Sequence, residues 1–254
     1  MSNLVLLQKH FPKRGKQQSL SSSLLEMLWK SRSTKPVQGF TLLELLVVIA
    51  IAAILAAIAA PGWLSFTNQR RVNVVREEIF RALQDAQREA QRTKRSYSVS
   101  FRVTTDANNQ TVPQIAIHRD AATANALPSQ DWKNLGTGLG VQPNQVLMYT
   151  NLQLPASADP AVSSINKAKA RSEIPNNNFP QPTLPVTITF DEQGILPPQP
   201  KTDLKDGFLI GVALPSPNNS LIPLNGTQRC VAITTLLASM EIREGAQCNP
   251  WQNP

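Results

Sequence analysis

Residues 39–49 read Gly-Phe-Thr-Leu-Leu-Glu-Leu-Leu-Val-Val-Ile, and the apolar run that begins here continues as far as Ala60. Between Phe40 and Ala60 only Thr41 and Glu44 are polar. A helix of this length rises by roughly 30 Å, which is the thickness of one hydrocarbon core. The stretch therefore predicts a single transmembrane helix over residues 40–60 with one carboxylate inside it.

Glu44 is the residue that sets this helix apart from an ordinary anchor. A carboxylate deep in a bilayer costs at least ~2.5 kcal/mol, so it needs a partner or a shallow position. Residues 40–60 contain no Lys or Arg. Two interpretations follow. In the first, a plain anchor keeps its glutamate near the headgroups or protonated. In the second, a cation from outside the segment pairs with it.

The Gly39-Phe40 junction, Glu44 and the unbroken apolar run together resemble the cleavage and methylation site of type IV prepilins and type II secretion pseudopilins. The resemblance implies that a membrane peptidase cuts after Gly39 and methylates the new amino group of Phe40. It also implies that Glu44 meets the N-terminal ammonium of a neighbouring subunit, so that two buried charges form one ion pair. The implied partners are the prepilin peptidase/methylase and other pilin or pseudopilin subunits.

The charge distribution predicts the orientation of the chain. The formal net charge is +8, and six of these charges belong to residues 1–39, a basic leader. Positive charge just before an apolar segment stays cytoplasmic. We therefore expect a single-pass protein of the inner membrane with its C-terminal head in the periplasm. The basic residues of the leader are Lys9, Lys13, Arg14, Lys16, Lys30, Arg32 and Lys35, against the single acid Glu26.

The leader lacks the apolar core and small-residue cleavage site of an ordinary secretory signal. It is long for a prepilin leader, and translation from Met27 would leave a short basic one ending at Gly39. The start at Met1 or at Met27 stays open at this point.

Residues 61–95 predict an amphipathic helix stalk that continues the transmembrane helix. Pro61 predicts a helix break in the sense of a bend or loosening between the two segments, because proline removes a backbone donor, and the helix need not end there. Arginines on the stalk are interleaved with acids, and this pattern favours a solvated face over a nucleic-acid site. The apolar positions at helical spacing are Val72, Val75, Ile79, Ala82 or Leu83, Ala86 and Ala90.

Residues 96–254 predict a β-rich globular head, interrupted by an Asn/Pro-rich insertion over about 104–185 that we expect to be mostly loop and inserted hairpin. The fold class is therefore α+β, with a long N-terminal helix packed on a C-terminal antiparallel β-sheet head. The predicted strands cover residues 96–103, 186–190, 207–214, 228–235 and 237–243, with a weaker candidate at 114–118.

Three further pieces of sequence resemble the GspH/FimT branch of minor pseudopilins. They are Arg88-Glu89-Ala90 leading into the strand at Tyr97, residues 188–194, and the ending from Arg229 to Cys248. The resemblance implies a low-copy subunit near a filament tip, with two β-sheets packed on the N-terminal helix.

Cys230 and Cys248 both lie in the part of the chain predicted to be exported, where disulfides persist. A bridge between them would stabilise the head by about 3 kcal/mol. The alternative is two free thiols.

The sequence shows no catalytic constellation. Its two histidines are His10 in the leader and His118, which we expect at the surface near a strand end. A His-based triad or zinc site cannot be built from them. Asp191 and Glu192 precede Gly194 in a way that indicates a turn rather than a calcium site. We therefore expect no enzyme, no cofactor, no metal and no small-molecule substrate.

Three functions remain, and the first is a minor pilin or pseudopilin of a type II secretion pseudopilus or a type IV pilus. The second is a DNA-binding tip pilin for DNA uptake, in which Arg229 and Arg243 would contact nucleic acid, although Glu241 and Glu244 would repel phosphate. The third is a plain membrane-anchored periplasmic binding domain that keeps its leader.

Overall fold

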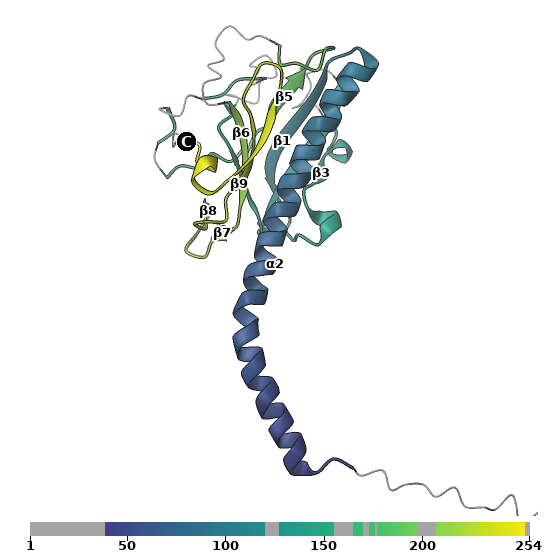
Figure 1. The fold of residues 1–254 in the computed structure, drawn as a ribbon. Helices are drawn as coiled ribbons and strands as arrows, with labels where there is room; N and C mark the ends of the chain where they lie inside the picture. The colour runs from purple at the N-terminus through teal and green to yellow at the C-terminus, as the bar shows by residue number, and fades with distance from the viewer. Residues whose placement is uncertain are drawn as a thin grey trace, which may run out of the picture. The chain divides into compact units, whose positions relative to one another are not determined.

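The computed structural model describes residues 39–119, 127–154, 165–169, 173–175, 177–197 and 207–251. They form one long helix followed by antiparallel sheets (Figure 1), which confirms the predicted α+β fold class. The chain divides into two units, residues 1–55 and residues 56–254. The first contributes the start of the helix, and the second holds the rest of the helix and every strand.

Helix α2 runs without interruption from Leu42 to Thr93. No interruption occurs at the predicted break at Pro61, and the stalk over residues 61–95 continues the segment over residues 40–60 as one helix. Proline removes only its own backbone donor, and its fixed φ of about −65° is itself a helical value, so the helix continues with one bond fewer. The helix ends where Lys94 adopts a left-handed φ of 55°, as is common just after a last helical turn.

The first sheet has the strand order β3-β2-β1-β5, and all of its neighbours are antiparallel. Its longest pairing joins β1 to β2 over nine residues of each strand. The strands are β1 (Tyr97–Thr105), β2 (Thr111–Arg119), β3 (Lys133–Asn134) and β5 (Val186–Phe190).

The second sheet has the order β10-β9-β6-β4 and is also antiparallel. A two-stranded hairpin, β7–β8, lies outside both sheets. The strands are β4 (Leu147–Thr150), β6 (Phe208–Ala213), β7 (Pro215–Ser216), β8 (Asn219–Pro223), β9 (Arg229–Ile233) and β10 (Met240–Glu244). Three short 3-10 helices are η2 (Ser129–Asp131), η3 (Thr137–Leu139) and η6 (Gly245–Cys248).

The described parts of residues 104–185 are mostly loop after Arg119, and the weaker strand candidate over residues 114–118 falls within β2. These described parts supply β2 and β3 to the first sheet and β4 to the second. Strand β2 contains Pro113, which cannot donate a ladder bond. Even so, Pro113 pairs opposite Val103 within the β1–β2 register, so pairing along the whole strand outweighs the local signal.

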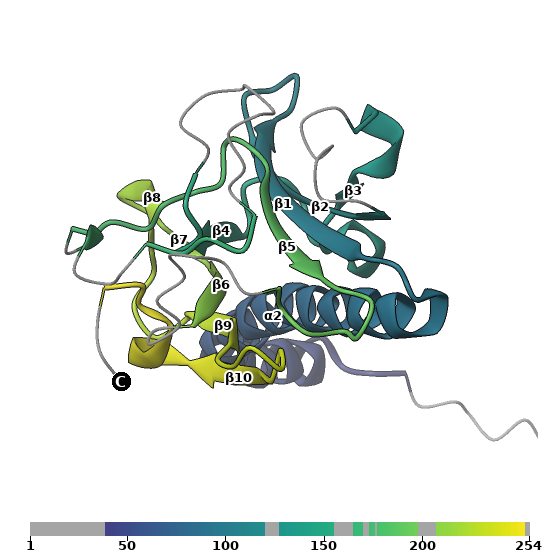
Figure 2. The same cartoon turned by 90° about the horizontal axis from the view of Figure 1, so that it is seen from above.

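The core of the head lies between the later part of α2 and both sheets. Figure 2 shows strands of the two sheets facing this part of the helix. The apolar stripe predicted from the 3.6-residue period is buried against them, as an amphipathic helix requires. Its fully covered members are Val72, Val75, Ile79, Leu83, Ala86 and Ala90, each at most 1% exposed. The sheets add alternate residues such as Phe101, Ile188, Ile210, Val231 and Ile233.

Polar side chains of α2 also bond to loops of the head. Gln87 Nε2 donates to the Gly194 carbonyl at 2.9 Å, and Gln91 Nε2 donates to the Gln193 carbonyl at 3.1 Å. One carboxylate oxygen of Glu78 accepts the Gly136 N–H at 2.7 Å. These bonds satisfy loop backbone groups that would otherwise lose water on packing, and they fix the helix along its axis.

A second apolar cluster covers the opposite face of the second sheet. Tyr149 packs edge-on against Phe179 with ring centroids 4.9 Å apart, and Phe179 packs in the same manner against Trp251 at 4.2 Å. Cys230 and Cys248 join this cluster as a disulfide. Burial raises the pKa of the Tyr149 hydroxyl well above its usual range, because the ring lies in an apolar environment.

Gly211 provides a test of this packing, because a Cβ at that position would overlap the Tyr149 ring of the adjacent strand. We expect Gly211→Ala to lower the free energy of unfolding by about 1–3 kcal/mol, the usual cost of overpacking. Chemical denaturation of the purified protein measures the change. Gly138→Ala is the control, since a Cβ there meets no atom within 4 Å, and equal stability of the two variants would contradict the packing described.

Candidate functional site

The start of α2 is capped by its own sequence. The Thr41 carbonyl accepts the Leu45 N–H at 3.1 Å, and Thr41 Oγ1 accepts the Glu44 N–H at 3.1 Å. Thr41 and Glu44 thus occupy the first and last positions of a capping-box sequence, although only the threonine half of the reciprocal pair is formed. The cap fixes where the helix begins, so Phe40 and the Gly39-Phe40 bond lie immediately outside it.

The Glu44 carboxylate lies in the first turn of α2 and is exposed. Within the part of the chain that the structure describes, no cation lies within ion-pair distance of it. Its position near the positive end of the helix dipole contributes only about 0.3–1 kcal/mol. This gain is smaller than the ~2.5 kcal/mol or more that a carboxylate costs in lipid, so the helix dipole alone does not compensate the charge.

The apolar residues that follow are uncovered. Every large one from Leu42 to Ile58 is between 47% and 81% exposed. By length and composition, α2 contains a window apolar enough to cross a membrane, and none of that window is buried. An apolar surface of this extent indicates a membrane or another protein as its cover.

The two candidate nucleic-acid contacts, Arg229 and Arg243, lie in the head close to acids. Arg229 Nε is 3.2 Å from Glu244 Oε1, and Arg76 approaches the same oxygen at 3.5 Å. Arg243 Nη2 is 2.8 Å from Glu241 Oε2. The Arg229 and Arg243 side chains are only 15% and 17% exposed. A phosphate would therefore have to displace a carboxylate to reach either guanidinium.

The Arg229 contact with Glu244 is an ion pair rather than a directed hydrogen bond, since Nε has no hydrogen-bond acceptor in line. Arg229 Nη1 instead donates to the carbonyl oxygens of Gly226 and Gln228, at 3.3 and 2.8 Å. These bonds hold the side chain against its own loop. They leave this arginine poorly placed for an external anion.

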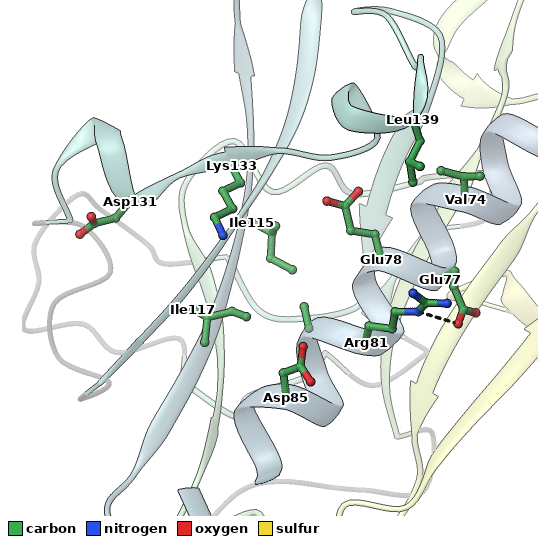
Figure 3. A pocket seen from close by; sticks show the side chains of 11 residues that line it. Val74, Glu77, Glu78, Arg81, Asp85, Ile115, Ile117, Asp131, Lys133 and Leu139 are labelled. Atoms are coloured by element: carbon green, nitrogen blue, oxygen red, sulfur yellow. Dashed lines mark hydrogen bonds and ion pairs between the residues drawn. The ribbon is translucent and has the colours of Figure 1, made fainter. Parts of the chain in front are cut away.

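A pocket of about 510 Å³ lies between α2 and the β2–β3 edge of the first sheet (Figure 3). Ile115 and Ile117 give it an apolar side, while Glu78 and Asp85 extend toward it from the helix. Arg81 does not face it as a free charge, because its Nε donates to Glu77 at 3.1 Å. The remaining lining residues are Val74, Ala82, Asp131, Lys133 and Leu139. Among the described residues that line this pocket there is no Ser, Cys or His.

A serine and a histidine do meet elsewhere in the head. Ser100 Oγ lies 2.8 Å from His118 Nε2, and the other ring nitrogen lies 3.1 Å from the Arg119 carbonyl oxygen. Ser100 is nevertheless fully buried and also bonds Thr187 Oγ1 at 2.7 Å. A substrate cannot reach this hydroxyl, so the pair belongs to a polar ladder inside the sheet. His118 lies next to the end of β2, as the sequence predicts, and its partly exposed side chain reaches Ser100 because β2 pairs with β1.

Metal ligands are not gathered in the described ranges, where no group of three or more His, Cys, Asp or Glu could hold an ion. In the acidic turn at Asp191, the Asp191 carboxylate accepts hydrogen bonds from backbone groups of the same turn. Asp191 Oδ1 accepts the N–H groups of Gln193 and Ile195 at 2.9 and 3.0 Å, which is the bonding of an Asx turn.

Sequence reasoning located Gly39, Phe40 and Glu44, but it missed the role of Thr41. The T-x-x-E spacing just before an apolar run was a readable signal for this cap. The second role that it missed is that of Glu244 as the shared partner of Arg76 and Arg229. No local pattern could reveal that role, since the three residues are brought together only by the packing of α2 on β9 and β10.

The family model of the prokaryotic N-terminal methylation motif matches residues 34–60. No curated protein and no solved structure matches the chain. The matched residues include the Gly39-Phe40 junction, Glu44 and the apolar run. The motif and the apolar helix fit a membrane-anchored, pilin-like protein that prepilin peptidase processes and that assembles with other pilin subunits.

Replacing Ser100 tests whether the serine–histidine contact is structural. We expect Ser100→Ala to lower the free energy of unfolding by about 1–3 kcal/mol, because His118 and Thr187 each lose a buried partner. Thermal or chemical unfolding measures this change, and Ser239→Ala at an exposed position is the control. Covalent labelling of the wild-type protein by a fluorophosphonate probe, lost in Ser100→Ala, would contradict the structural role.

Proposed function

We propose that this chain is a minor pilin or pseudopilin, a structural subunit of a type II secretion pseudopilus or a type IV pilus. Prepilin peptidase cleaves it after Gly39 and methylates the amino group of Phe40. The observation that carries the proposal is Glu44, a carboxylate with no cation among the described residues, at the start of an uncovered apolar helix and within a methylation motif.

Filament assembly supplies a cation for the Glu44 carboxylate. Cleavage creates an ammonium group at Phe40, just before the Thr41 cap. In a filament, the ammonium of one subunit pairs with the Glu44 carboxylate of its neighbour, and each charge offsets the desolvation of the other. The exposed faces of the apolar helices cover one another at the same time. A subunit with one partner missing would leave an uncompensated charge in an apolar surrounding, so pairing selects the correct register.

The orientation follows from the basic leader, which stays in the cytoplasm while the head lies in the periplasm. The disulfide between Cys230 and Cys248 supports this part of the proposal, because disulfides persist in oxidising compartments. Residues 1–38 lie outside the described residues, and whether translation starts at Met1 or Met27 does not alter the processed chain.

The assignment to a minor subunit of the GspH/FimT type rests on the head. Its two four-stranded antiparallel sheets pack on the later part of the N-terminal helix, and this is the architecture that the sequence resemblance implies. The methylation motif and this kind of head are common to secretion pseudopili and type IV pili, so the proposal covers both systems.

The proposal includes the absence of catalytic activity. The buried Ser100, the pocket whose described lining has no Ser, Cys or His, and the internally bonded Asp191 support it. A DNA-uptake role has weaker support, because Glu241 and Glu244 already occupy the two arginines that would serve it. A plain anchored binding domain would use the pocket of Figure 3 and would keep its leader.

Processing is tested by intact mass and N-terminal sequencing of protein extracted from membranes. We expect a chain that begins at Phe40 and carries one added methyl group, because the peptidase recognises the Gly39-Phe40 junction. Gly39→Val should leave the leader attached, while Gly62→Val, outside the motif, should be processed normally. Wild-type protein that retains residues before Gly39 would contradict the filament proposal and favour the anchored domain.

Glu44 is tested by incorporation into filaments. We expect Glu44→Ala to be cleaved normally but lost from sheared or purified filaments, because the neighbour's ammonium no longer has its counter-ion. Glu77→Ala is the matched control, since Glu77 is a partly exposed helix glutamate of the head. Immunoblots of membrane and filament fractions report both steps. Glu44→Ala subunits that enter filaments as well as wild type would refute the ion-pair mechanism.

A further inference from the structure

Helix α2 carries a distinct surface between the end of the apolar run at Ala60 and the first buried residue of the head, Val72. We call this surface the collar. It consists of three large apolar side chains followed by two cations. Its members are Trp63, Leu64, Phe66, Arg70 and Arg71.

The apolar part of the collar is open to its surroundings. Trp63, Leu64 and Phe66 are 68%, 63% and 59% exposed. Trp63 and Phe66 are three residues apart, so they share one face of the helix, and their ring centroids are 6.2 Å apart. Two adjacent aromatic rings without a cover indicate a surrounding that is not bulk water.

The charged part differs from the rest of the helix. Farther along α2, Arg81, Arg88 and Arg92 are each paired with an acid three or four residues earlier. Within the described residues, Arg70 and Arg71 form no such ion pair, and Arg71 bonds only the neutral Asn68 amide oxygen at 3.1 Å. The collar therefore presents positive charge that the head has not neutralised.

We propose that the collar lies in the headgroup layer on the outer face of the membrane, where it binds anionic phospholipids. Trp63 and Phe66 occupy the interfacial level that tryptophan prefers, and Arg70 and Arg71 face the lipid phosphates. The proposal rests on the membrane anchoring in the proposed function and does not depend on filament assembly.

The spacing along the helix agrees with this placement. Trp63 lies roughly 5 Å beyond Ala60 at 1.5 Å per residue, which is within the polar layer of about 5–7 Å on each side of the hydrocarbon core. The arginine backbones lie farther out, but helical side chains lean toward the N-terminus and so back toward the lipid. Both guanidinium groups then come within about one Debye length, ~8–10 Å, of the phosphates.

The order of the residues favours lipid over a protein partner. Along the helix an aliphatic run is followed by aromatic rings and then by cations, and a bilayer interface has the same sequence of environments. A protein partner would require complementary acids opposite Arg70 and Arg71 but would not require this order. The collar thereby fixes how deeply the helix is inserted and brings the start of the head close to the membrane surface.

The experiment uses the full chain reconstituted in vesicles of phosphatidylcholine with phosphatidylglycerol, and co-flotation establishes insertion. The fluorescence of Trp63 is obtained by subtracting the tryptophan emission of the Trp63→Phe variant from that of the wild type. Trp29, Trp132 and Trp251 are common to both proteins and so cancel. We expect lipids brominated near the headgroup end of the acyl chain to quench this difference signal. Lipids brominated near the chain terminus should quench it less.

The arginines are tested by access of acrylamide to Trp63. We expect phosphatidylglycerol to lower acrylamide quenching of the Trp63 signal relative to vesicles of phosphatidylcholine alone. Arg70→Gln combined with Arg71→Gln should abolish that difference, and high salt should do the same. The matched pair Arg81→Gln with Arg88→Gln should preserve it, because those arginines are already neutralised by acids.

Three results would overturn the proposal in distinguishable ways. An inserted chain whose Trp63 signal is not quenched by either brominated lipid would show that the collar lies outside the lipid. A Trp63 signal that lipid quenches but that responds equally with and without phosphatidylglycerol would show that the collar does not bind anionic phospholipids. A chain that does not float with the vesicles would remove the membrane anchoring itself, and with it the proposed function.

Discussion

The head depends on the burial of one face of α2 between two sheets. Each four-stranded sheet presents an apolar face, and residues such as Ile79 and Leu83 fill the space between these faces. Burial of large aliphatic side chains is the main favourable term in such a core. Hydrogen bonds join the side chains of Gln87, Gln91 and Glu78 to loop backbone groups. These bonds fix the position of the helix and contribute less to the free energy of folding than the apolar burial does. Without this part of the helix, both sheets would expose the faces that now form the core.

The same helix meets an opposite requirement before residue 61. There its apolar side chains are uncovered and carry one acid, Glu44, so this part cannot be stable alone in water. Continuity of α2 through Pro61 makes one element serve both purposes. The apolar side chains of the later part are covered by the sheets of the same chain. Those of the earlier part can be covered only by lipid or by other subunits. That difference is why we assign the chain to an assembly.

Many charged side chains of the head form ion pairs with nearby residues of opposite charge. Acids pair with Arg229, Arg243 and most arginines of the helix surface, and the exposed pairs on the helix contribute little to stability. Their effect is to leave the head without a strong basic surface. The net charge of +8 therefore reflects the leader and topology rather than affinity for nucleic acid, and the unpaired arginines of the collar stand out against this background.

The sequence by itself determined the features that depend on neighbours along the chain. The apolar run, Glu44, the cleavage junction and the buried stripe of α2 follow from composition and from a 3.6-residue period, and most strands follow from alternation. The tertiary structure decided what depends on distant residues: the pairing of β2 despite Pro113, the contact of His118 with Ser100, and the shared ion pair at Glu244. Local patterns state which face of an element is apolar, but only the packing of helix on sheet determines which polar groups then meet.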